Sequence, residues 1–243
     1  MRLLLGDATD NNLLPRESVD LIVTSPPYNL GKGYEETMSM SRYLVLTRAW
    51  ADTCYGWTKD NGRMCVNLPL DVSVPEHWPL YAKTVNYFLS AGWHYRTTII
   101  WDEGNISKRT AWGSWKSATA PNIIAPVEVI LVLFKGNWKR SKPEEIQDDI
   151  TADEFVKWTK GLWSFPGESA KRIGHEAPFP RELPKRCIKL FSFPGDTVLD
   201  PFAGSGTTLI EALANDRKAI GIEIEQRYIE LALQRIDRYR SSS

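Results

Sequence analysis

The chain has 243 residues, of which 42% are hydrophobic and 25% charged, and its 30 basic residues balance its 30 acidic ones. This length allows one domain with a sizeable core, and the apolar content excludes a disordered chain. The formal net charge of +0 excludes a strongly basic, histone-like protein, although nucleic-acid binding needs only a local basic patch.

The cysteines and the apolar runs indicate where the protein resides. Cys54, Cys65 and Cys187 are far apart and form no C-x-x-C pair, which predicts a reducing compartment and no structural metal. The N-terminal run Leu3–Leu5 turns polar too early for a signal peptide. The run Val129–Phe134 is far shorter than the roughly 20 residues of a membrane helix. We therefore expect a cytoplasmic protein without a membrane segment.

Apolar runs bounded by turn residues predict the elements of the first half of the chain. In chain order these are strands at 3–5 and 19–23, a helix at 41–57, a strand at 64–68 after a turn at 60–62, a helix at 78–89, and strands at 97–101 and 127–134.

The composition changes between residues 135 and 174. A basic cluster comes first, formed by Lys135, Lys139, Arg140 and Lys142, and acidic residues follow it as far as Glu154. We interpret residues 136–174 as a short insertion or lid within a single domain that spans residues 1–243, and as the candidate segment for target recognition.

The last third of the chain alternates helices and strands. The pattern predicts a helix at 181–191, a strand at 197–199, a helix at 207–214, a strand at 219–222 and a helix at 226–239. Such alternation is typical of an α/β fold, with a parallel sheet covered by helices on both faces.

A glycine-rich loop, DPFAGSGTT from Asp200 to Thr208, connects a predicted strand to a predicted helix. Gly204 and Gly206 let the backbone turn tightly and approach a ligand closely. Glu223 closes the next strand, 19 residues after Gly204. That is about the spacing at which an acidic side chain reaches ribose hydroxyls in Rossmann-type sites.

The residues around this loop narrow the ligand class. Thr207 stands where a P-loop has lysine, and Leu209 stands where a dinucleotide loop has its third glycine. The leading acid Asp200 suits a cationic ligand better than a pyrophosphate. Adenosine with a positively charged amino-acid tail fits, which points to S-adenosylmethionine. The alternative is a glycine turn that binds no ligand.

A second segment, Thr24-Ser25-Pro26-Pro27-Tyr28, closes an early strand. Its prolines stiffen the backbone and remove two N–H donors. A planar base stacked on Tyr28 would place its amine near the Ser25 hydroxyl and the Pro26 carbonyl. These acceptors would localise the amine lone pair for direct displacement of a methyl group, without a covalent enzyme intermediate. Taken alone, the segment also fits a structural Pro-Pro turn.

Five segments together resemble the amino-methyltransferases of DNA. They are Gly6-Asp7, VDLIVTSPPYNLG at 19–31, GHEAPFP at 174–180, VLDPFAGSGTT at 198–208 and GIEIEQRYIELALQRI at 221–236. The SPPY segment precedes the glycine loop, which resembles the β group of that family, a circular permutation of the usual motif order. The resemblance implies a Rossmann-like methyltransferase sheet with helices on both faces and S-adenosylmethionine as cofactor. It also implies base flipping, because the target amine lies inside the duplex.

The resemblance implies roles for individual residues. Asp7 would lie near the adenine of the cofactor, and Glu223 would bind the ribose hydroxyls. The target-amine site would comprise Ser25, Pro26, Pro27 and Tyr28. The loop that holds the cofactor would comprise Asp200, Phe202, Ala203, Gly204, Ser205, Gly206 and Thr207. The segment from His175 to Pro180, with Pro178 and Phe179, would line the cofactor pocket.

Position 25 bears on the target base. Adenine enzymes of the family usually have aspartate there, and Ser25 resembles the N4-cytosine enzymes. We therefore expect transfer to the N4 amine of a flipped cytosine in duplex DNA, with N6 of adenine as the alternative. C5-cytosine methylation needs a thiolate nucleophile after a proline, and the three cysteines follow Thr, Met and Arg.

Double-stranded DNA is the expected partner, and a homodimer and a companion restriction endonuclease are compatible with the resemblance. The basic cluster and Lys171-Arg172 are candidates for phosphate contacts, or else solvated surface. Trp112 and Trp115 are candidates for base stacking or packing, and residues 29–34 for a mobile loop that closes over the base. Two other classes stay open: a DNA-binding protein that has lost catalysis, and a methyltransferase for RNA or protein amines.

Overall fold

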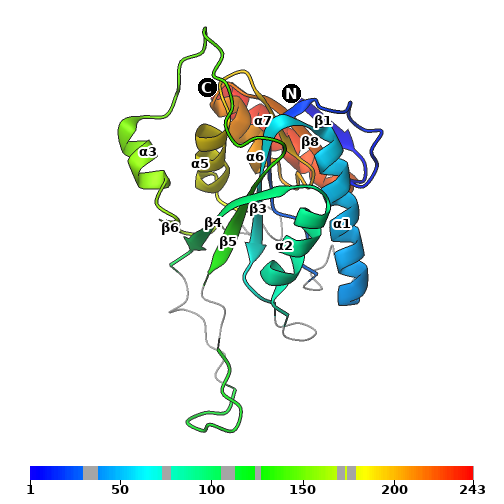
Figure 1. Cartoon of the computed structure of the whole chain (residues 1–243), viewed down its shortest axis with the longest axis vertical. Coiled ribbons are helices and arrows are strands. Elements are labelled where there is room, and N and C mark those ends of the chain that lie inside the picture. The colour runs from blue at the N-terminus through cyan, green and yellow to red at the C-terminus, as the bar shows by residue number, and fades with distance from the viewer. Residues whose placement is uncertain are drawn as a thin grey trace.

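Figure 1 shows a computed structural model of the chain, which describes residues 1–29, 38–72, 78–104, 113–123, 127–168, 173 and 179–242. One sheet runs through it in the strand order β1-β8-β7-β2-β3-β5-β4-β6. The strands are β1 (Arg2–Leu5), β2 (Val19–Thr24), β3 (Thr58–Pro69), β4 (His94–Asp102), β5 (Glu128–Phe134), β6 (Leu162–Ser164), β7 (Thr197–Asp200) and β8 (Lys218–Glu223).

Helices cover both faces of this sheet. They are α1 (Met40–Trp57), α2 (Leu80–Ser90), α3 (Ala152–Trp158), α5 (Glu182–Phe191), α6 (Thr207–Ala214) and α7 (Gln226–Ser242). Of the helices in the described ranges, none combines the length and the apolarity needed to cross a membrane.

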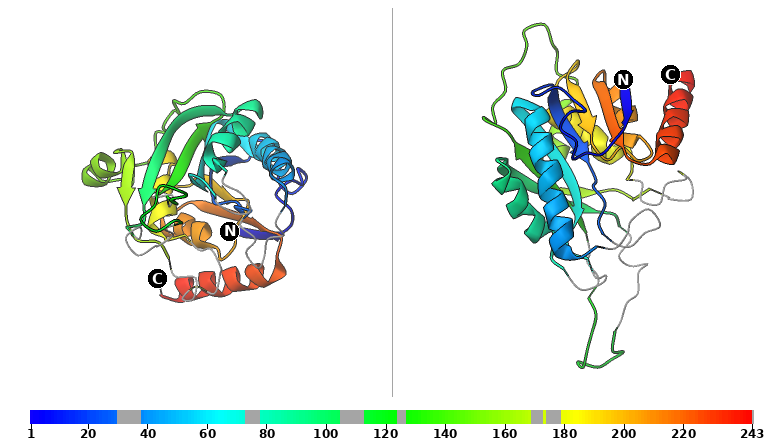
Figure 2. Two further views of the ribbon diagram at one scale, coloured as in Figure 1. Left: turned by 90° about the horizontal axis from the view of Figure 1, so that it is seen from below. Right: turned by 90° about the vertical axis from the view of Figure 1, so that its right-hand side faces the viewer.

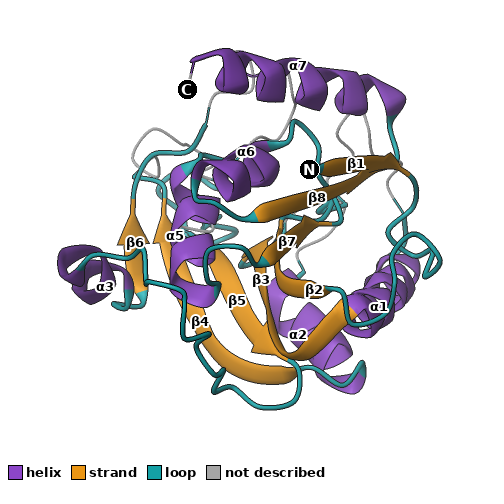
Figure 3. Cartoon of the chain, turned by 90° about the horizontal axis from the view of Figure 1, so that it is seen from above, coloured by secondary structure: helices purple, strands orange, loops and turns teal. Residues whose placement is uncertain are grey.

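The sheet separates two apolar cores, because side chains alternate between its faces along each strand. On one face, Ile22 of β2 lies in a cluster with Trp50 of α1 and Phe88 of α2. On the other face, Leu21 of β2 lies in a cluster with Leu183 of α5. Figure 3 shows α1 and α2 on one side of the sheet and α5 and α6 on the other. The predicted α/β fold with helices on both faces is confirmed.

The sheet is mixed, which corrects the prediction of a parallel sheet. Strands β1, β8, β7, β2 and β3 are parallel, whereas β5 runs antiparallel to both β3 and β4. An apolar run marks a strand but not its direction, and antiparallel neighbours need no crossover helix. The turn predicted at 60–62 is also wrong. Strand β3 continues through it with a register irregularity, where Asn61 has a φ of 65°.

The strand order places a crevice at one edge of the sheet. The chain leaves β7 towards β8 on one side and leaves β2 towards β3 on the other, so the order reverses between β7 and β2. Ligands of open α/β sheets bind outside the carboxyl ends of strands at such a reversal. The segments that follow β1, β2, β7 and β8 all emerge at this carboxyl edge, since these strands are parallel.

Two connections extend from opposite ends of the sheet, as Figures 1 and 2 show. Residues 113–123, between β4 and β5, project beyond the carboxyl edge. Residues 136–150, after β5, lie at the amino edge, because β5 is antiparallel to β3. The chain then forms α3 and β6, and β6 pairs in parallel with β4, which brings Ser164 opposite Asp102. The end of this segment thus returns to the carboxyl edge.

Candidate active site

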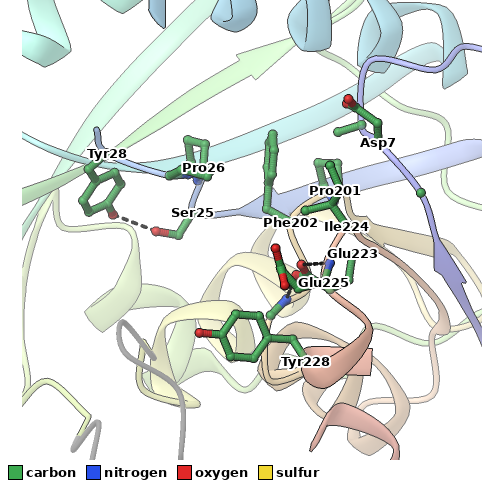
Figure 4. Close-up of a pocket in the computed structure, with 14 residues that line it drawn as sticks. Asp7, Ser25, Pro26, Tyr28, Pro201, Phe202, Glu223, Ile224, Glu225 and Tyr228 are labelled. Atoms are coloured by element: carbon green, nitrogen blue, oxygen red, sulfur yellow. Dashed lines mark hydrogen bonds between the residues drawn. The ribbon is translucent and has the colours of Figure 1, made fainter. Parts of the chain in front are cut away.

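A cavity of about 230 Å³ lies at the carboxyl edge of the sheet (Figure 4). Segments that are far apart in the sequence line it. They are residues 6–8 after β1, residues 25–28 after β2, Pro201, Phe202 and Gly204 after β7, and Glu223 at the end of β8 with Ile224, Glu225 and Tyr228 beyond it. The SPPY segment and the glycine loop therefore share one cavity.

The glycine loop adopts a backbone shape that depends on its two glycines. Gly204 and Gly206 have φ angles of 48° and 78°, in the left-handed region that other residues rarely adopt. A Cβ on Gly206 would also lie 3.0 Å from the Cβ of Ala232 in α7. The N–H groups of Ala203 and Gly206 donate to carbonyls of the protein itself. Because these donors are already used, the loop is poorly arranged to cradle a phosphate.

Glu223, the last residue of β8, holds the glycine loop with both carboxylate oxygens. Its Oε2 accepts the Gly204 N–H at 2.8 Å, and its Oε1 accepts the Glu225 N–H at 2.9 Å. The side chain is fixed in this way at the cavity wall. Each carboxylate oxygen has a further lone pair, so the position suits an acceptor for ribose hydroxyls.

Asp200, the last residue of β7, is 1% exposed. Its Oδ1 accepts the Thr24 hydroxyl at 2.7 Å and the Phe202 N–H at 3.1 Å. Its Oδ2 is buried without a hydrogen-bond partner in the described part of the chain. Burial raises the pKa of Asp200 to about 6, although the hydrogen bond from Thr24 opposes this rise. A cation nearby would favour the ionised form again.

The charged lining of the cavity is acidic. Asp7, Glu223 and Glu225 line it, and no Lys, Arg or His is found among the lining residues that the structure describes. An acidic cavity attracts a cationic ligand and repels a pyrophosphate. Together with the unpartnered oxygen of Asp200, these features fit S-adenosylmethionine, which carries a sulfonium and an ammonium group.

The SPPY segment forms the wall opposite Glu223 (Figure 4). Ser25 Oγ lies 2.7 Å from Tyr28 Oη. Tyr43 of α1 donates its hydroxyl to the Pro27 carbonyl at 2.9 Å. Asn29 has a backbone φ of 60°, and its side chain forms two hydrogen bonds of 2.8 Å with the Met38 backbone. The turn is thus anchored behind the cavity, which keeps Ser25 in place.

Two residues beside this segment were not predicted from the sequence. Asn67 of β3 is 1% exposed, and its Nδ2 lies 2.9 Å from Tyr28 Oη. Glu128 begins β5, and its Oε2 lies 3.3 Å from Tyr28 Oη and 2.6 Å from Asn67 Nδ2. The available signals were a polar residue inside a buried strand and an acid at the start of an apolar run. Neither indicates a neighbour in space.

Several predicted cofactor residues lie behind the cavity wall. The Ser205 carbonyl and the Thr207 hydroxyl accept hydrogen bonds from Arg235 of α7. Asp200, Ala203 and Gly206 are also absent from the described lining, so none of the five lies at the described surface of the cavity.

The segment predicted to line the cofactor pocket, residues 175–180, is described only in part. Phe179 is half-buried and packs against the core on the α5 and α6 face, away from the described lining. His175 and Pro178 lie outside the described residues.

The basic cluster, for which phosphate contact and solvated surface were both open, lies at the amino edge of the sheet and not at the cavity. Arg140 pairs with Asp196 at 2.8 Å and with Asp20 at 3.2 Å. Lys135 is 6% exposed and donates to the Thr58 carbonyl at 2.8 Å. Both lie past the end of β5, at the amino edge of the sheet, where they hold the connection in place. Residues 171–172 lie outside the described residues.

Trp115, by contrast, lies in the projection at the carboxyl edge. It is 61% exposed, so it does not contribute to a core. Trp112 and residues 30–34, which include most of the predicted mobile loop, lie outside the described residues.

The three thiols are buried. Burial raises the pKa of Cys54 and of Cys65, which disfavours their thiolate forms. Since the thiolate is the nucleophile in cysteine chemistry, these two environments agree with the expectation that C5-cytosine methylation is not the reaction.

Comparison with known proteins relates the chain to DNA methyltransferases. A family model described as DNA methylase, of the N6/N4 methyltransferase type, matches residues 19–234. The chain is 50% identical over 173 residues to the type II methyltransferase M.MjaVI of Methanocaldococcus jannaschii, which covers 70% of this chain and 88% of that relative. It is 30% identical over 251 residues to the DNA adenine methyltransferase YhdJ of Escherichia coli, and the match covers 96% of this chain and 81% of that relative.

Solved structures agree with the fold. TTHA0409 of Thermus thermophilus, solved in complex with S-adenosyl-L-methionine, matches with a TM-score of 0.79 at 30% identity and covers 98% of this chain and 93% of that one. The cytosine-N4-specific PvuII DNA methyltransferase matches with a TM-score of 0.74 at 19% identity, and the match covers 98% of this chain and 90% of that one. The predicted Rossmann-like methyltransferase fold and the S-adenosylmethionine cofactor are confirmed.

Proposed function

Because the chain belongs to the N4/N6 family of DNA amino-methyltransferases, we propose that it methylates the exocyclic N4 amine of a flipped cytosine in duplex DNA. The observation that carries the proposal is Ser25, which places a neutral hydroxyl in the cavity wall where adenine enzymes of the family usually have a carboxylate. S-adenosylmethionine supplies an electrophilic methyl group on its sulfonium sulfur.

Acidic residues of the cavity hold the cofactor in this proposal. Glu223 accepts the ribose hydroxyls, since its oxygens are already aligned by two backbone N–H groups. Asp200 attracts the ammonium group through its buried charge, and Asp7 lies beside the adenine. Gly204 and Gly206 give the loop the shape that lets the ligand approach the backbone.

The SPPY segment binds the target base. The Tyr28 ring stacks on the base, a contact worth about 1–3 kcal/mol. Ser25 Oγ and the Pro26 carbonyl accept hydrogen bonds from the amine, whose lone pair is otherwise delocalised into the ring. Positive charge develops on the amine nitrogen as the methyl group arrives, and acceptors that are already in place stabilise it.

The DNA lies against the carboxyl edge of the sheet in this proposal, because the cavity opens there. Residues 113–123 project on the same side and carry the exposed Trp115 and Lys116. We assign these two residues to DNA contact. Within the described part of residues 136–174, the part that returns to this edge lies beyond β6, where the Phe165 N–H donates to the Asp102 carbonyl. A contribution of that segment to target recognition is therefore assigned to its end.

A restriction-modification role follows from the type II names of the relatives. We propose a companion restriction endonuclease that recognises the same sequence, a homodimer as the assembly, and a cytoplasmic location with the DNA. N6-methylation of adenine is the second candidate, favoured by the adenine methyltransferase that is 30% identical to this chain.

The proposal is tested by expressing the protein in a host that lacks N4-methylcytosine and sequencing the host genome by a single-molecule method that detects modified bases. We expect modified cytosines at one short repeated motif with the wild type, and none with Ser25→Ala. Modified adenines at such a motif would replace the cytosine assignment with the adenine one. An unmodified genome in the presence of folded, cofactor-binding protein would overturn DNA methylation itself.

A further inference from the structure

A chain of hydrogen bonds leads from the cavity to Glu128. Ser25 Oγ lies 2.7 Å from Tyr28 Oη, and Tyr28 Oη lies 3.3 Å from Glu128 Oε2. The Asn67 side chain joins the last two groups, with its Nδ2 at 2.9 Å from Tyr28 Oη and 2.6 Å from Glu128 Oε2. Strands β3 and β5 and the segment that follows β2 thus meet at the phenol oxygen.

The donors and acceptors of this chain of hydrogen bonds favour one direction. An ionised carboxylate only accepts, and the Asn67 amide has two hydrogens, one for Glu128 and one for Tyr28. The reverse orientation of the amide would place Asn67 Oδ1 against the carboxylate, where two acceptors repel each other.

Tyr28 has one hydroxyl hydrogen, and Glu128 is a stronger acceptor for it than the backbone carbonyl of Asn67. The backbone carbonyl oxygen of Asn67 lies at the same distance from Tyr28 Oη as Glu128 Oε2, 3.3 Å. A neutral carbonyl, however, accepts a hydrogen bond more weakly than a carboxylate does. When Tyr28 donates to Glu128, its lone pairs accept from Asn67 Nδ2 and from the Ser25 hydroxyl. The Ser25 hydrogen then points at Tyr28, and the lone pairs of Ser25 Oγ are left for the cavity.

We propose that Glu128 is a positioning residue for methyl transfer, whose carboxylate orients the Tyr28 and Ser25 hydroxyls so that Ser25 Oγ accepts a hydrogen bond from the target amine. The inference rests on the proposed role of Ser25, and it holds for either base. Without a charged acceptor at the end of the chain, Ser25 can turn its hydrogen towards the amine. It would then compete for the lone pair that must attack the methyl group.

Glu128 also contributes charge. Its carboxylate is connected to the amine through two hydroxyl groups, and hydrogen bonds in a chain polarise one another. The chain therefore brings negative charge to the place where positive charge develops in the transition state.

A double-mutant cycle tests this inference. Glu128→Gln keeps the size of the side chain and removes its charge, and we expect kcat to fall about tenfold, which corresponds to about 1.4 kcal/mol of lost transition-state stabilisation. The KM for S-adenosylmethionine should stay within about twofold. Tyr28→Phe keeps the stacking ring and breaks the chain, so adding Glu128→Gln to it should change kcat by less than about twofold. If Glu128→Gln lowers kcat by the same factor in the Tyr28→Phe background as in the wild type, the proposal is overturned.

Two further variants separate charge from structure. Glu128→Asp keeps the charge on a shorter side chain and should recover part of the kcat that Glu128→Gln loses. Equal losses in the two variants would contradict a role for the charge. Glu230→Gln, at an exposed carboxylate of α7, is the matched control and should leave kcat unchanged. The identity of the methylated base is determined separately, so a failed base assignment does not affect this test.

A measurement without cofactor or DNA provides an independent readout. Burial and the Glu128 charge both hold the pKa of Tyr28 well above its usual value. In protein labelled with 13C at tyrosine Cζ, Glu128→Gln should move the Tyr28 resonance at neutral pH and lower its pKa. Tyr43, the other tyrosine whose charge acts on Tyr28, is assigned by Tyr43→Phe and serves as a reference. An unchanged Tyr28 resonance would overturn the coupling to Glu128.

Discussion

Thr24, at the end of β2, donates a hydrogen bond of 2.7 Å to Asp200, at the end of β7, across 176 positions of the chain. Thr24 directly precedes Ser25, and Asp200 begins the glycine loop. Both residues are 1% exposed, so water does not compete for the bond. One buried contact therefore ties the target-amine segment to the cofactor loop, which explains why two distant motifs form the walls of one cavity.

Ser25→Ala should separate catalysis from cofactor binding. The variant removes one acceptor for the target amine, and we expect kcat to fall on the order of 10²-fold, the size seen when one transition-state hydrogen bond is lost. The Kd of S-adenosylmethionine, measured by calorimetry, should stay within about twofold. Ser41→Ala, at an exposed position at the start of α1, is the matched control. Loss of cofactor binding in Ser25→Ala would contradict the assigned role.

Cofactor affinity should weaken as the pH falls through about 6. In the cofactor-free protein, burial raises the pKa of Asp200 to about 6. A bound cation favours the ionised carboxylate, so binding lowers this pKa. Above pH 6 the group is already ionised and affinity is level, whereas below pH 6 binding must release a proton and Kd rises by up to about tenfold per pH unit.

Calorimetry in buffers of different ionisation enthalpy measures both Kd and the released proton. Asp200→Asn should bind the cofactor weakly at every pH and lose the dependence, because its side chain does not titrate. A wild-type Kd that stays constant from about pH 7 to about pH 5 would show that Asp200 does not sense the ligand charge.

Trp115→Ala should weaken DNA binding without affecting cofactor binding. The indole is 61% exposed at the carboxyl edge, and loss of one stacking contact costs about 1–3 kcal/mol, or roughly tenfold in Kd. Lys139→Ala is the matched control, because Lys139 is exposed at the amino edge. Fluorescence anisotropy with a labelled duplex measures both. A larger effect of Lys139→Ala would place the DNA on the opposite edge.

Arg140→Ala should lower stability and leave DNA affinity unchanged. The Arg140 side chain is 14% exposed and its guanidinium pairs with Asp20 and Asp196, which would lose their shared partner. We expect the free energy of unfolding to fall by about 2–3 kcal/mol, somewhat below the cost of breaking a fully buried pair. Lys142→Ala breaks an exposed pair with Asp148 and should cost at most about 1 kcal/mol. Denaturant titration measures both, and a loss of DNA binding without destabilisation would contradict the structural role of Arg140.

The two motifs of the site could be predicted because each follows a strand directly. Ser25 comes after β2 and Asp200 closes β7, and the carboxyl ends of parallel strands meet at one edge of a sheet. The spacing between Gly204 and Glu223 likewise reflects a local unit, in which one helix connects two neighbouring strands. Local patterns of this kind are visible in the sequence.

Contacts made by strand pairing could not be predicted in the same way. Glu128 reaches Tyr28 because β5 pairs antiparallel with β3, and the apolar run from residue 129 onward does not encode that direction. Arg140 resembled a surface cation in the sequence, yet its acidic partners come from residues 20 and 196. In both cases the side chain that the residue contacts is distant in the sequence. The local sequence therefore does not indicate the contact of Glu128 with Tyr28, and it suggests a free surface cation at Arg140 where the structure has a paired one.

The central claim is tested most directly by identifying the methylated nucleoside. The purified protein is incubated with unmethylated genomic DNA and methyl-labelled S-adenosylmethionine, and the DNA is digested to nucleosides for mass spectrometry. The account predicts label in N4-methylcytosine, absent with the Ser25→Ala variant. Label in N6-methyladenine would contradict the base assignment, and unlabelled DNA with a cofactor-bound protein would contradict the proposed reaction.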